Sequence, residues 1–376
     1  MSIATSAERQ RTSSEGRADG IVDSDVHNTL ASNDLLRPYL SQRWTGELER
    51  FGLRRPDSIG FFSTRPRKFA ARTDAWPVGG VPGGDLELMR EQLLDRFPIA
   101  ATILNPINQT TVGAQPAAFS AALCRALNEL TLAEWIEADE RLYGAICVPC
   151  EDARLAAEEA HRLGDHPRFV QLLVNVRTRE PLGNRSYWPL YEAAVEHGLP
   201  VAVHVGGHGG NTITGSGWPS YYFEDHAGYP QAFQSQLISL VFEGVFERYP
   251  DLKIVLQEGG FAWMSWLMWR MDSAWRRLRD EVPHLERPPS EIVREHFWFT
   301  TQPIEEPERP QQFAELWEDV GMPTRALFAS DYPHWDFDAP DRALPSVLDA
   351  ETKRAVLGGN ARALYPQLAD ARVPVR

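Results

Sequence analysis

The sequence has little cysteine and no long apolar run. Its three cysteines, Cys124, Cys147 and Cys150, are too few for the disulfide framework of a small secreted domain. Cys147 and Cys150 form a Cys-Val-Pro-Cys pair, but no second pair follows, so a zinc ribbon is excluded and strand packing is favoured over a redox role. No stretch reaches the roughly 18 apolar residues of a membrane span, and the first twenty residues lack the apolar segment of a secretory signal. We therefore expect a cytoplasmic protein whose residues 1–19 form a disordered tail.

Positive charge is also scarce. The chain has 38 basic and 52 acidic side chains, and its formal net charge of −14 excludes the basic surface that binding to nucleic acid or acidic membranes requires. Only Lys68, Lys253 and Lys353 are lysines, so nearly all the positive charge is arginine. Arginine can grip a carboxylate with two hydrogen bonds, so the expected partner is a small-molecule substrate.

Apolar runs and helical periods alternate along the rest of the chain. Most of the runs are almost continuously apolar, as strands buried on both faces should be. The expected strands are residues 21–27, 99–104, 143–148, 169–176, 201–205, 252–258, 297–301 and 326–331. The expected helices are 86–97, 114–140, 151–163, 187–197, 231–248, 261–279, 311–320 and 349–357, with a short one near Ala361.

This alternation predicts the α/β class and a (β/α)8 TIM-type barrel spanning residues 20–376. The alternative is a doubly wound open sheet, but the first strand is followed by Ser24-Asp25-Val26-His27-Asn28 and not by a glycine-rich phosphate loop. Residues 28–84 are rich in Pro, Gly and Arg, with a helix expected only near 33–44, and we interpret them as a lid-like insertion after strand 1. That insertion and the loop 206–228 are where we expect substrate specificity to lie.

Polar residues end several of the apolar strands, and in a barrel these positions face the active site. Asp25 and His27 lie two residues apart on strand 1, so both project to the same side. His204 is the only polar residue of strand 5, and Asp331 closes strand 8. Two imidazoles and two carboxylates suit Zn²⁺ or another divalent ion with a position left open for water or substrate.

Several motifs resemble the amidohydrolase-related family, the branch of the amidohydrolase superfamily that contains aminocarboxymuconate semialdehyde decarboxylase and γ-resorcylate decarboxylase. They are Asp25-Val26-His27, the strand ending at His204, and Ser330-Asp331-Tyr332-Pro333-His334-Trp335-Asp336. The resemblance covers roughly residues 20–366. It implies one divalent metal, Zn²⁺ or Mn²⁺, held by Asp25, His27, His204 and Asp331, and a homodimer or higher homo-oligomer.

Strand 6 departs from the family pattern. Decarboxylating members usually carry a histidine there, whereas this chain has Gln257-Glu258-Gly259-Gly260 with Glu258 at the expected position. A carboxylate can act as general base or as a further metal ligand, but shuttling protons near neutral pH requires a raised pKa.

Other residues expected at the same end of the barrel complete the candidate site. His334, together with Asp331 and Glu258, is a candidate catalytic residue, and the candidate substrate-binding residues are Arg177, His208, His226 and Gln302. His208 and His226 are expected in the loop after strand 5. Trp263, Trp266 and Trp269 lie along one side of the helix after strand 6 and favour core or subunit packing over substrate stacking.

Three functions follow from this site. The first is hydrolysis of a small, cyclic or aromatic carboxylated substrate by metal-activated water, with Asp331 and Glu258 sharing the base and acid roles. The alternative is metal-dependent, non-oxidative decarboxylation of an aromatic or muconate-type acid, which the resemblance favours. A second alternative is a barrel that binds a ligand without catalysis. The absence of the strand 6 histidine places hydrolysis slightly ahead.

Overall fold

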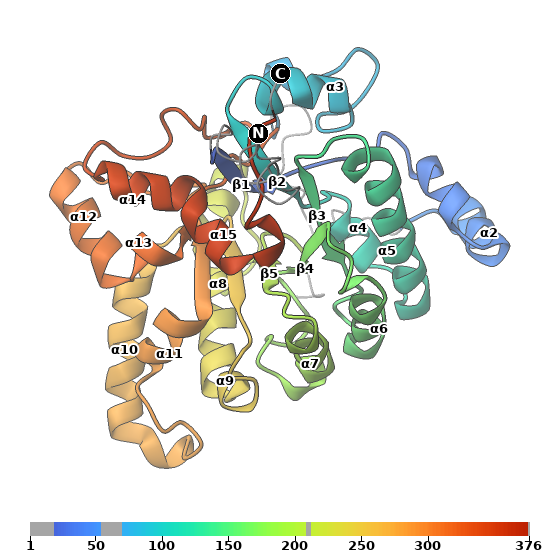
Figure 1. The fold of residues 1–376 in the computed structure, drawn as a ribbon. Coiled ribbons are helices and arrows are strands. Elements are labelled where there is room, and N and C mark those ends of the chain that lie inside the picture. The colour runs from blue at the N-terminus through green and yellow to red at the C-terminus, as the bar shows by residue number, and fades with distance from the viewer. Residues whose placement is uncertain (1–18, 54–69, 208–211, 375–376) are drawn as a thin grey trace, which may run out of the picture.

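Eight parallel strands lie side by side in chain order in the computed structural model, which describes residues 19–53, 70–207 and 212–374 (Figure 1). The strands are β1 Ile21–Val26, β2 Ile99–Leu104, β3 Leu142–Cys147, β4 Phe169–Asn175, β5 Val201–His204, β6 Ile254–Gln257, β7 Phe297–Thr300 and β8 Ala326–Leu327. Backbone hydrogen bonds join β1 to the chain after β8, from Ser24 N to Phe328 O and from His27 N to Tyr332 O, both 2.8 Å. The expected (β/α)8 barrel is confirmed.

Helices cover the outside of the barrel. The α-helices are α2 Gln42–Phe51, α3 Leu86–Met89, α4 Gln109–Gly113, α5 Ala117–Thr131, α6 Ala153–Leu163, α7 Trp188–Glu196, α8 Tyr222–Phe242, α9 Val245–Arg248, α10 Trp263–Leu278, α11 Pro289–His296, α12 Pro310–Asp319, α13 Met322–Arg325, α14 Ala350–Arg354 and α15 Asn360–Leu364. Short 3-10 or π turns are η1 Asn33–Tyr39, η3 Thr73–Ala75, η4 Arg90–Leu94, η5 Leu132–Ile136, η6 Arg185–Tyr187, η7 Arg279–Glu281, η8 Ala355–Gly359 and η9 Pro366–Leu368. Among the described residues, none of these helices is both long and apolar enough to cross a membrane.

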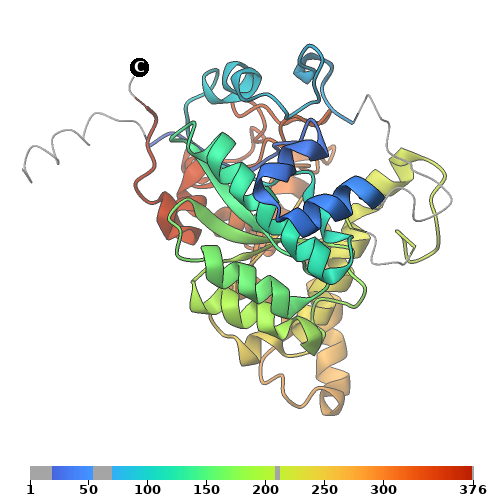
Figure 2. The ribbon, with the colours of Figure 1, turned by 90° about the vertical axis from the view of Figure 1, so that its right-hand side faces the viewer.

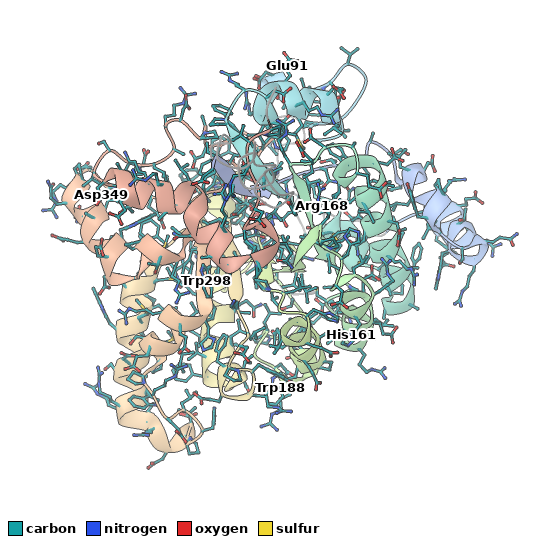
Figure 3. The ribbon with its side chains drawn as sticks, viewed as in Figure 1. Glu91, His161, Arg168, Trp188, Trp298 and Asp349 are labelled. Atoms are coloured by element: carbon teal, nitrogen blue, oxygen red, sulfur yellow. The ribbon has the colours of Figure 1, made fainter. Side chains whose placement is uncertain are left out.

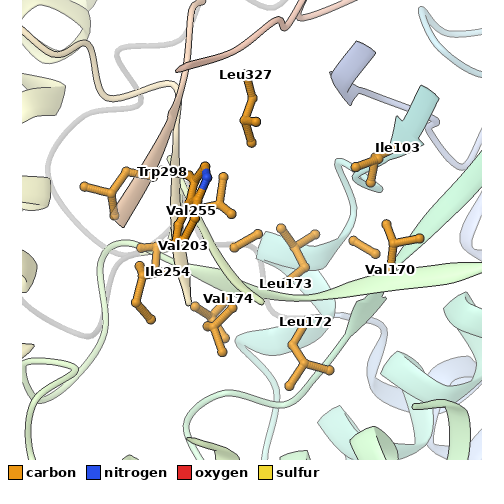
Figure 4. Close-up of a cluster of buried hydrophobic side chains, with 14 of the residues drawn as sticks. Ile103, Val170, Leu172, Leu173, Val174, Val203, Ile254, Val255, Trp298 and Leu327 are labelled. Carbon is orange, nitrogen blue, oxygen red and sulfur yellow. The ribbon is translucent and has the colours of Figure 1, made fainter. Parts of the chain in front are cut away.

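The core lies between the strands and this helical layer, and it continues into the barrel. Figure 4 shows buried apolar side chains contributed by six strands: Ile103 of β2, Val170, Leu172, Leu173 and Val174 of β4, Val203 of β5, Ile254 and Val255 of β6, Trp298 of β7, and Leu327 of β8. Cys147 ends β3 and is buried, as expected for strand packing, and Cys150, which is also buried, follows the strand. Because parallel strands are covered on both faces, most residues within them are apolar.

Several elements differ from the sequence prediction. Strand 8 is only Ala326–Leu327, because the chain then turns to bond with β1 instead of extending along β7. Helix α8 begins at Tyr222, nine residues before the expected start, and continues through Pro230. Helix α11 was not expected. The expected helix 114–140 is divided into α5 and the π turn η5, with α4 preceding them.

The insertion after β1 packs in two places. Trp44 of α2 stacks on Phe119 of α5 at 5.4 Å between ring centroids, so this part lies against the outside of the barrel (Figure 2). Its last part crosses the loop after β8, where Arg72 N donates to Pro333 O at 2.9 Å. The lid role of residues 28–84 and the tail over 1–19 stay predictions, and residues 1–18 and 54–69 lie outside the described chain.

Candidate active site

A small cavity, partly open to solvent, lies at the carboxyl ends of the strands. Its lining includes His27 after β1, Asn105 after β2, Asn175 and His204 at the ends of β4 and β5, and Glu258 after β6. Parallel strands of a barrel point their carboxyl ends to one side, so residues far apart in the sequence meet there.

The strand 1 pair is held by Asn105. The Nδ1 of His27 lies 2.7 Å from the backbone oxygen of Asn105, and the side-chain amide of Asn105 donates to Asp25 Oδ1 at 2.8 Å. The side-chain oxygen of Asn105 accepts a hydrogen bond from the side-chain amide of Gln171 at 3.0 Å. The side-chain oxygen of Gln171 in turn accepts one from the Tyr365 hydroxyl at 2.7 Å. This buried chain of hydrogen bonds fixes Asp25, and the His27 contact turns Nε2 toward the site.

His204 approaches the pair from strand 5. Its Nδ1 lies 2.7 Å from Val205 O and donates a hydrogen bond to it, so in the neutral ring the lone pair is on Nε2. Nε2 lies 3.3 Å from Asp25 Oδ2 and 3.5 Å from Glu258 Oε2. Ligand atoms of Asp25, His27 and His204 all fall within 4.8 Å of one another, which is the spacing that a metal ion can bridge.

Asp331 and Glu258 are placed by unusual backbone conformations. Their φ angles are 56° and 67°, in the left-handed region that non-glycine residues adopt rarely and at an energetic cost of about 1–3 kcal/mol each. Asp331 Oδ1 lies 2.8 Å from His27 Nε2 and 2.7 Å from His334 Nδ1. The Glu258 backbone N–H donates to Thr300 Oγ1 at 3.1 Å. Backbone strain of this kind is common at functional sites, and here the two strained residues are Asp331 and Glu258.

Burial makes the charges in this group strongly interdependent. Burial raises the pKa of Glu258 well above its ordinary value, and the nearby charge of Asp331 raises it further. Burial lowers the pKa of His27, but Asp25 and Asp331 outweigh that effect and raise it to about 9. Carboxylates this close repel one another unless a proton or a cation lies between them.

The side chains fit a divalent metal ion. Three buried polar atoms of the group have no hydrogen-bond partner among the described residues: His204 Nε2, Glu258 Oε2 and Asp331 Oδ2. An orphaned polar atom is costly in a protein interior, and a cation would satisfy all three. Imidazole nitrogens mixed with carboxylate oxygens suit Zn²⁺ and Mn²⁺.

The structure brings some of the other predicted residues to the cavity and leaves others outside it. His334 lines the cavity beside Asp331. Arg177 is paired with Asp225 at 2.8 Å, and Gln302 donates to Asp336 O at 3.3 Å; neither is a lining residue. His208 lies outside the described residues.

His226 is not in a loop, as the sequence led us to expect, but on helix α8. Glu224 caps the start of this helix, accepting from Ser220 N and Tyr221 N at 2.7 Å each, so the helix can begin well before Pro230. The His226 Nε2 contacts Asp336 Oδ2 at 3.0 Å, at the edge of the cavity.

Several lining residues were missed by the sequence reasoning. Asn105 and Asn175 follow or end apolar strands, so the rule that found His204 could have found them. Tyr222, Tyr229 and Asp336 come from α8 and from the loop after β8, where no period or spacing indicates that they face the cavity.

Comparison with known proteins gives this site a family. The sequence model of the amidohydrolase family matches residues 22–367. A γ-resorcylate decarboxylase from Polaromonas sp. is 27% identical over 301 residues, which cover 75% of this chain and 87% of that protein. A 2-keto-4-carboxy-3-hexenedioate hydratase from Sphingobium sp. is 25% identical over 210 residues, 52% of this chain and 54% of the hydratase.

The fold has solved counterparts as well. A 5-carboxyvanillate decarboxylase from Novosphingobium aromaticivorans, complexed with manganese and 4-hydroxy-3-methoxy-5-nitrobenzoic acid, superposes with a TM-score of 0.68 at 16% identity, covering 94% of this chain and 97% of that one. This likeness supports the barrel fold. The family match covers nearly the whole barrel, which confirms the resemblance inferred from the sequence motifs and removes the non-catalytic alternative. The chain belongs to the amidohydrolase family and is an enzyme, a hydrolase or carboxy-lyase of that superfamily.

Proposed function

We propose that the protein is a metal-dependent, non-oxidative decarboxylase of a small aromatic or muconate-type acid. One observation carries the proposal: two imidazoles and three carboxylates converge at the carboxyl end of the barrel in a chain related to γ-resorcylate decarboxylase over three-quarters of its length. This reverses the order suggested by the sequence, in which hydrolysis came first, because the comparisons favour the decarboxylase alternative.

Asp25, His27, His204 and Asp331 would hold the metal ion. When bound, a divalent ion supplies a Lewis acid that orients the substrate carboxylate and a neighbouring oxygen. Oxygen ligands from Asp25 and Asp331 favour manganese over zinc, and the structure of the related 5-carboxyvanillate decarboxylase contains manganese. We therefore propose Mn²⁺ as the physiological ion.

Glu258 would supply the proton that decarboxylation needs. Its buried carboxyl group has a raised pKa and lines the cavity, so it can carry a proton next to a bound ring. As the bond between the ring carbon and the carboxyl carbon breaks, its electron pair stays on the ring carbon, which takes the proton from Glu258 while CO₂ leaves. Hydrolysis would need Glu258 as a deprotonated base, a state that its burial disfavours.

Asp331 and His334 form a second acid–base pair beside this one. The 2.7 Å contact between His334 Nδ1 and Asp331 Oδ1 orients the Asp331 carboxylate and leaves the other edge of the imidazole available at the cavity. We assign His334 the role of returning a proton from solvent after each turnover, because its side chain is the more exposed of the two, 18% against 0%.

The decisive experiment measures metal content and product together. Purified enzyme should contain one divalent ion per chain and release CO₂ from at least one hydroxybenzoate or muconate-type acid in a panel. His204→Ala and Asp331→Asn should lose both metal and activity, whereas His284→Ala, which removes an exposed histidine away from the cavity, should keep both. Acid production from amides or lactones without CO₂ release would instead support hydrolysis.

We also propose that the enzyme forms a homodimer through α10. Trp266 and Trp269 are 53% and 60% exposed on this helix, while Trp263 and Trp275 pack against the core. Two large aromatic side chains on one exposed helical face are typical of a subunit contact. Light scattering should give a dimer for the wild type and a monomer for the Trp266→Lys, Trp269→Lys double variant; a monomeric wild type would contradict the proposal.

The cytoplasmic location expected from the sequence stays a prediction.

A further inference from the structure

A cluster of two histidines and a carboxylate lies at the opposite end of the barrel from the cavity. His161 stands near the end of α6, on the outer surface of the molecule (Figure 3), and Glu196 and His197 stand at the end of α7. The strands that follow these helices, β4 and β5, begin only a few residues later. The cluster is therefore at the amino ends of the strands, where residues of a barrel enzyme do not take part in the reaction.

The ligand atoms of this cluster already point at one another. His161 Nδ1 lies 3.0 Å from His197 Nε2 and 3.9 Å from Glu196 Oε2, and one ligand atom of each residue falls within 4.8 Å of the others. In tetrahedral zinc sites, metal–nitrogen bonds of about 2.05 Å place two nitrogens about 3.3 Å apart. An opening of a few tenths of an ångström would therefore admit an ion between the two imidazoles.

A second carboxylate fixes the orientation of His197. The Nδ1 of His197 lies 2.8 Å from Asp165 Oδ1, so the proton of the neutral imidazole is on Nδ1. The lone pair of His197 Nε2 then faces His161. This is the arrangement in which a carboxylate orients a metal-binding histidine. Asp165 is not one of the three proposed ligands, so it can orient His197 while all three bind an ion.

Gly164 allows the ring to reach this position. A Cβ at residue 164 would lie 2.4 Å from His197 Cγ, so any side chain there would push the imidazole away. The His197 side chain is only 9% exposed, whereas that of His161 is 47% exposed. One imidazole is thus largely buried and the other is exposed, so the exposed ring has room to adjust around an ion that arrives from solvent.

We infer that His161, Glu196 and His197 form a second metal site that takes a transition-metal ion such as Zn²⁺, with water as the fourth ligand. Two imidazoles and one carboxylate favour zinc, nickel or copper over the harder manganese. The site would join the ends of α6 and α7 and would not depend on the ion at the active site.

Zinc stoichiometry tests this inference. The enzyme is loaded with Zn²⁺ at both sites, dialysed against a fixed free zinc concentration, and analysed for metal per chain. The wild type should bind one ion more than His161→Ala, and His161→Ala should keep its catalytic activity. His284→Ala is the matched control because it also removes one exposed histidine, and it should bind as much zinc as the wild type.

A second variant separates a built site from simple surface binding. Asp165→Asn leaves all three ligands in place but weakens the hold on His197, so the affinity of the additional ion should fall at least tenfold. Equal stoichiometry in wild type and His161→Ala, or unchanged affinity in Asp165→Asn, would overturn the inference. Because the comparison counts the difference between variants, its result is independent of whether the active site holds metal.

Discussion

Glu258 is the residue on which the proposed chemistry depends most. Glu258→Gln keeps the size and hydrogen-bonding capacity of the side chain but cannot donate a carboxylic proton, so turnover should fall by about 10²–10⁴-fold. Metal content should stay near the wild-type value, because the four proposed ligands are intact. The rate of CO₂ release and the metal per chain are measured together.

The control for this variant is Glu159→Gln, which changes another buried glutamate that bonds Arg162 and Asn128 away from the cavity. It should retain wild-type turnover. If Glu258→Gln also retains it, Glu258 is not the proton donor, and His334 becomes the candidate for that role.

Asp338 should make the folded protein less stable as the pH rises. Burial, reinforced by Asp336 and Asp331, raises its pKa to about 7. The unfolded chain ionises an aspartate near pH ~4, so between ~4 and 7 the folded protein binds the extra proton and its stability falls with increasing pH. Asp338→Asn should therefore raise the free energy of unfolding by roughly 2 kcal/mol at pH 8, after allowance for solvent screening, and by little at pH 4.

Urea unfolding of wild type and variant at both pH values measures this effect, with Asp341→Asn as a control for loss of an exposed carboxylate in the same loop. A difference of the same size at pH 4 and pH 8 would mean that the substitution acts through packing and not through ionisation.

The candidate ligands could be predicted because each interrupts or ends an apolar strand. His204 and Asp25 are conspicuous for this reason, and the resemblance added the expectation that Glu258 occupies a functional position. The side-chain atoms of these residues come together only because the backbone turns sharply at Glu258 and Asp331, where the φ angles are 67° and 56°. No local sequence pattern predicts these turns. Asn105 follows a strand much as His204 ends one, so its position could be predicted. Its hydrogen bond to Asp25 could not, because the two residues are 80 positions apart in the sequence.

At the scale of elements, the start of α8 controls one wall of the cavity. Glu224 accepts hydrogen bonds from two backbone N–H groups at the N-terminus of this helix, and the first two turns carry Tyr222 and Tyr229 into the cavity lining. Glu224→Ala should loosen these turns by about 1 kcal/mol. We expect faster amide exchange over residues 222–229 and a raised KM with a smaller change in kcat.

Glu247→Ala, an exposed substitution on α9, should leave both exchange and KM unchanged. Protection of 222–229 equal to that of the wild type in Glu224→Ala would show that the helix is held by its packing and not by its cap.

Strands and helices differed in how well the sequence predicted them. Strands β1 to β7 were placed within two residues at either end, because burial on both faces produces continuous apolar runs, which surface helices and loops rarely contain. The start of α8 was misplaced because Gly228 and Pro230 resemble a break, whereas Pro230 is accommodated inside the helix. Strand β8 was predicted too long because the apolar residues Phe328 and Ala329 continue to be buried after the strand ends.

The single-domain organisation of residues 20–376 stays a prediction, but for the whole molecule the eight strands pair in chain order as one barrel. The alternation of elements was sufficient to predict this, because eight successive strand–helix repeats are the number that closes a parallel barrel. The packing of the insertion could not be predicted: its contacts, such as Trp44 on Phe119, join residues 75 positions apart and leave no periodic trace.

Metal removal should weaken the whole barrel, because the proposed ligands come from strands at opposite ends of the sequence. Asp25 lies on β1 and His27 follows it, His204 ends β5, and Asp331 follows β8, so one ion would join the first and last strands where the barrel closes. Chelation leaves the buried carboxylates to repel one another. Adding Mn²⁺ at about 100 times its Kd should raise the free energy of unfolding by roughly 2.7 kcal/mol, which corresponds to a rise of a few degrees in Tm.

Calorimetry of chelated and reloaded enzyme measures this rise in Tm, and His204→Ala should show a much smaller one. A Tm that is the same with and without Mn²⁺ in the wild type would mean that these side chains do not hold the barrel closed through a metal ion.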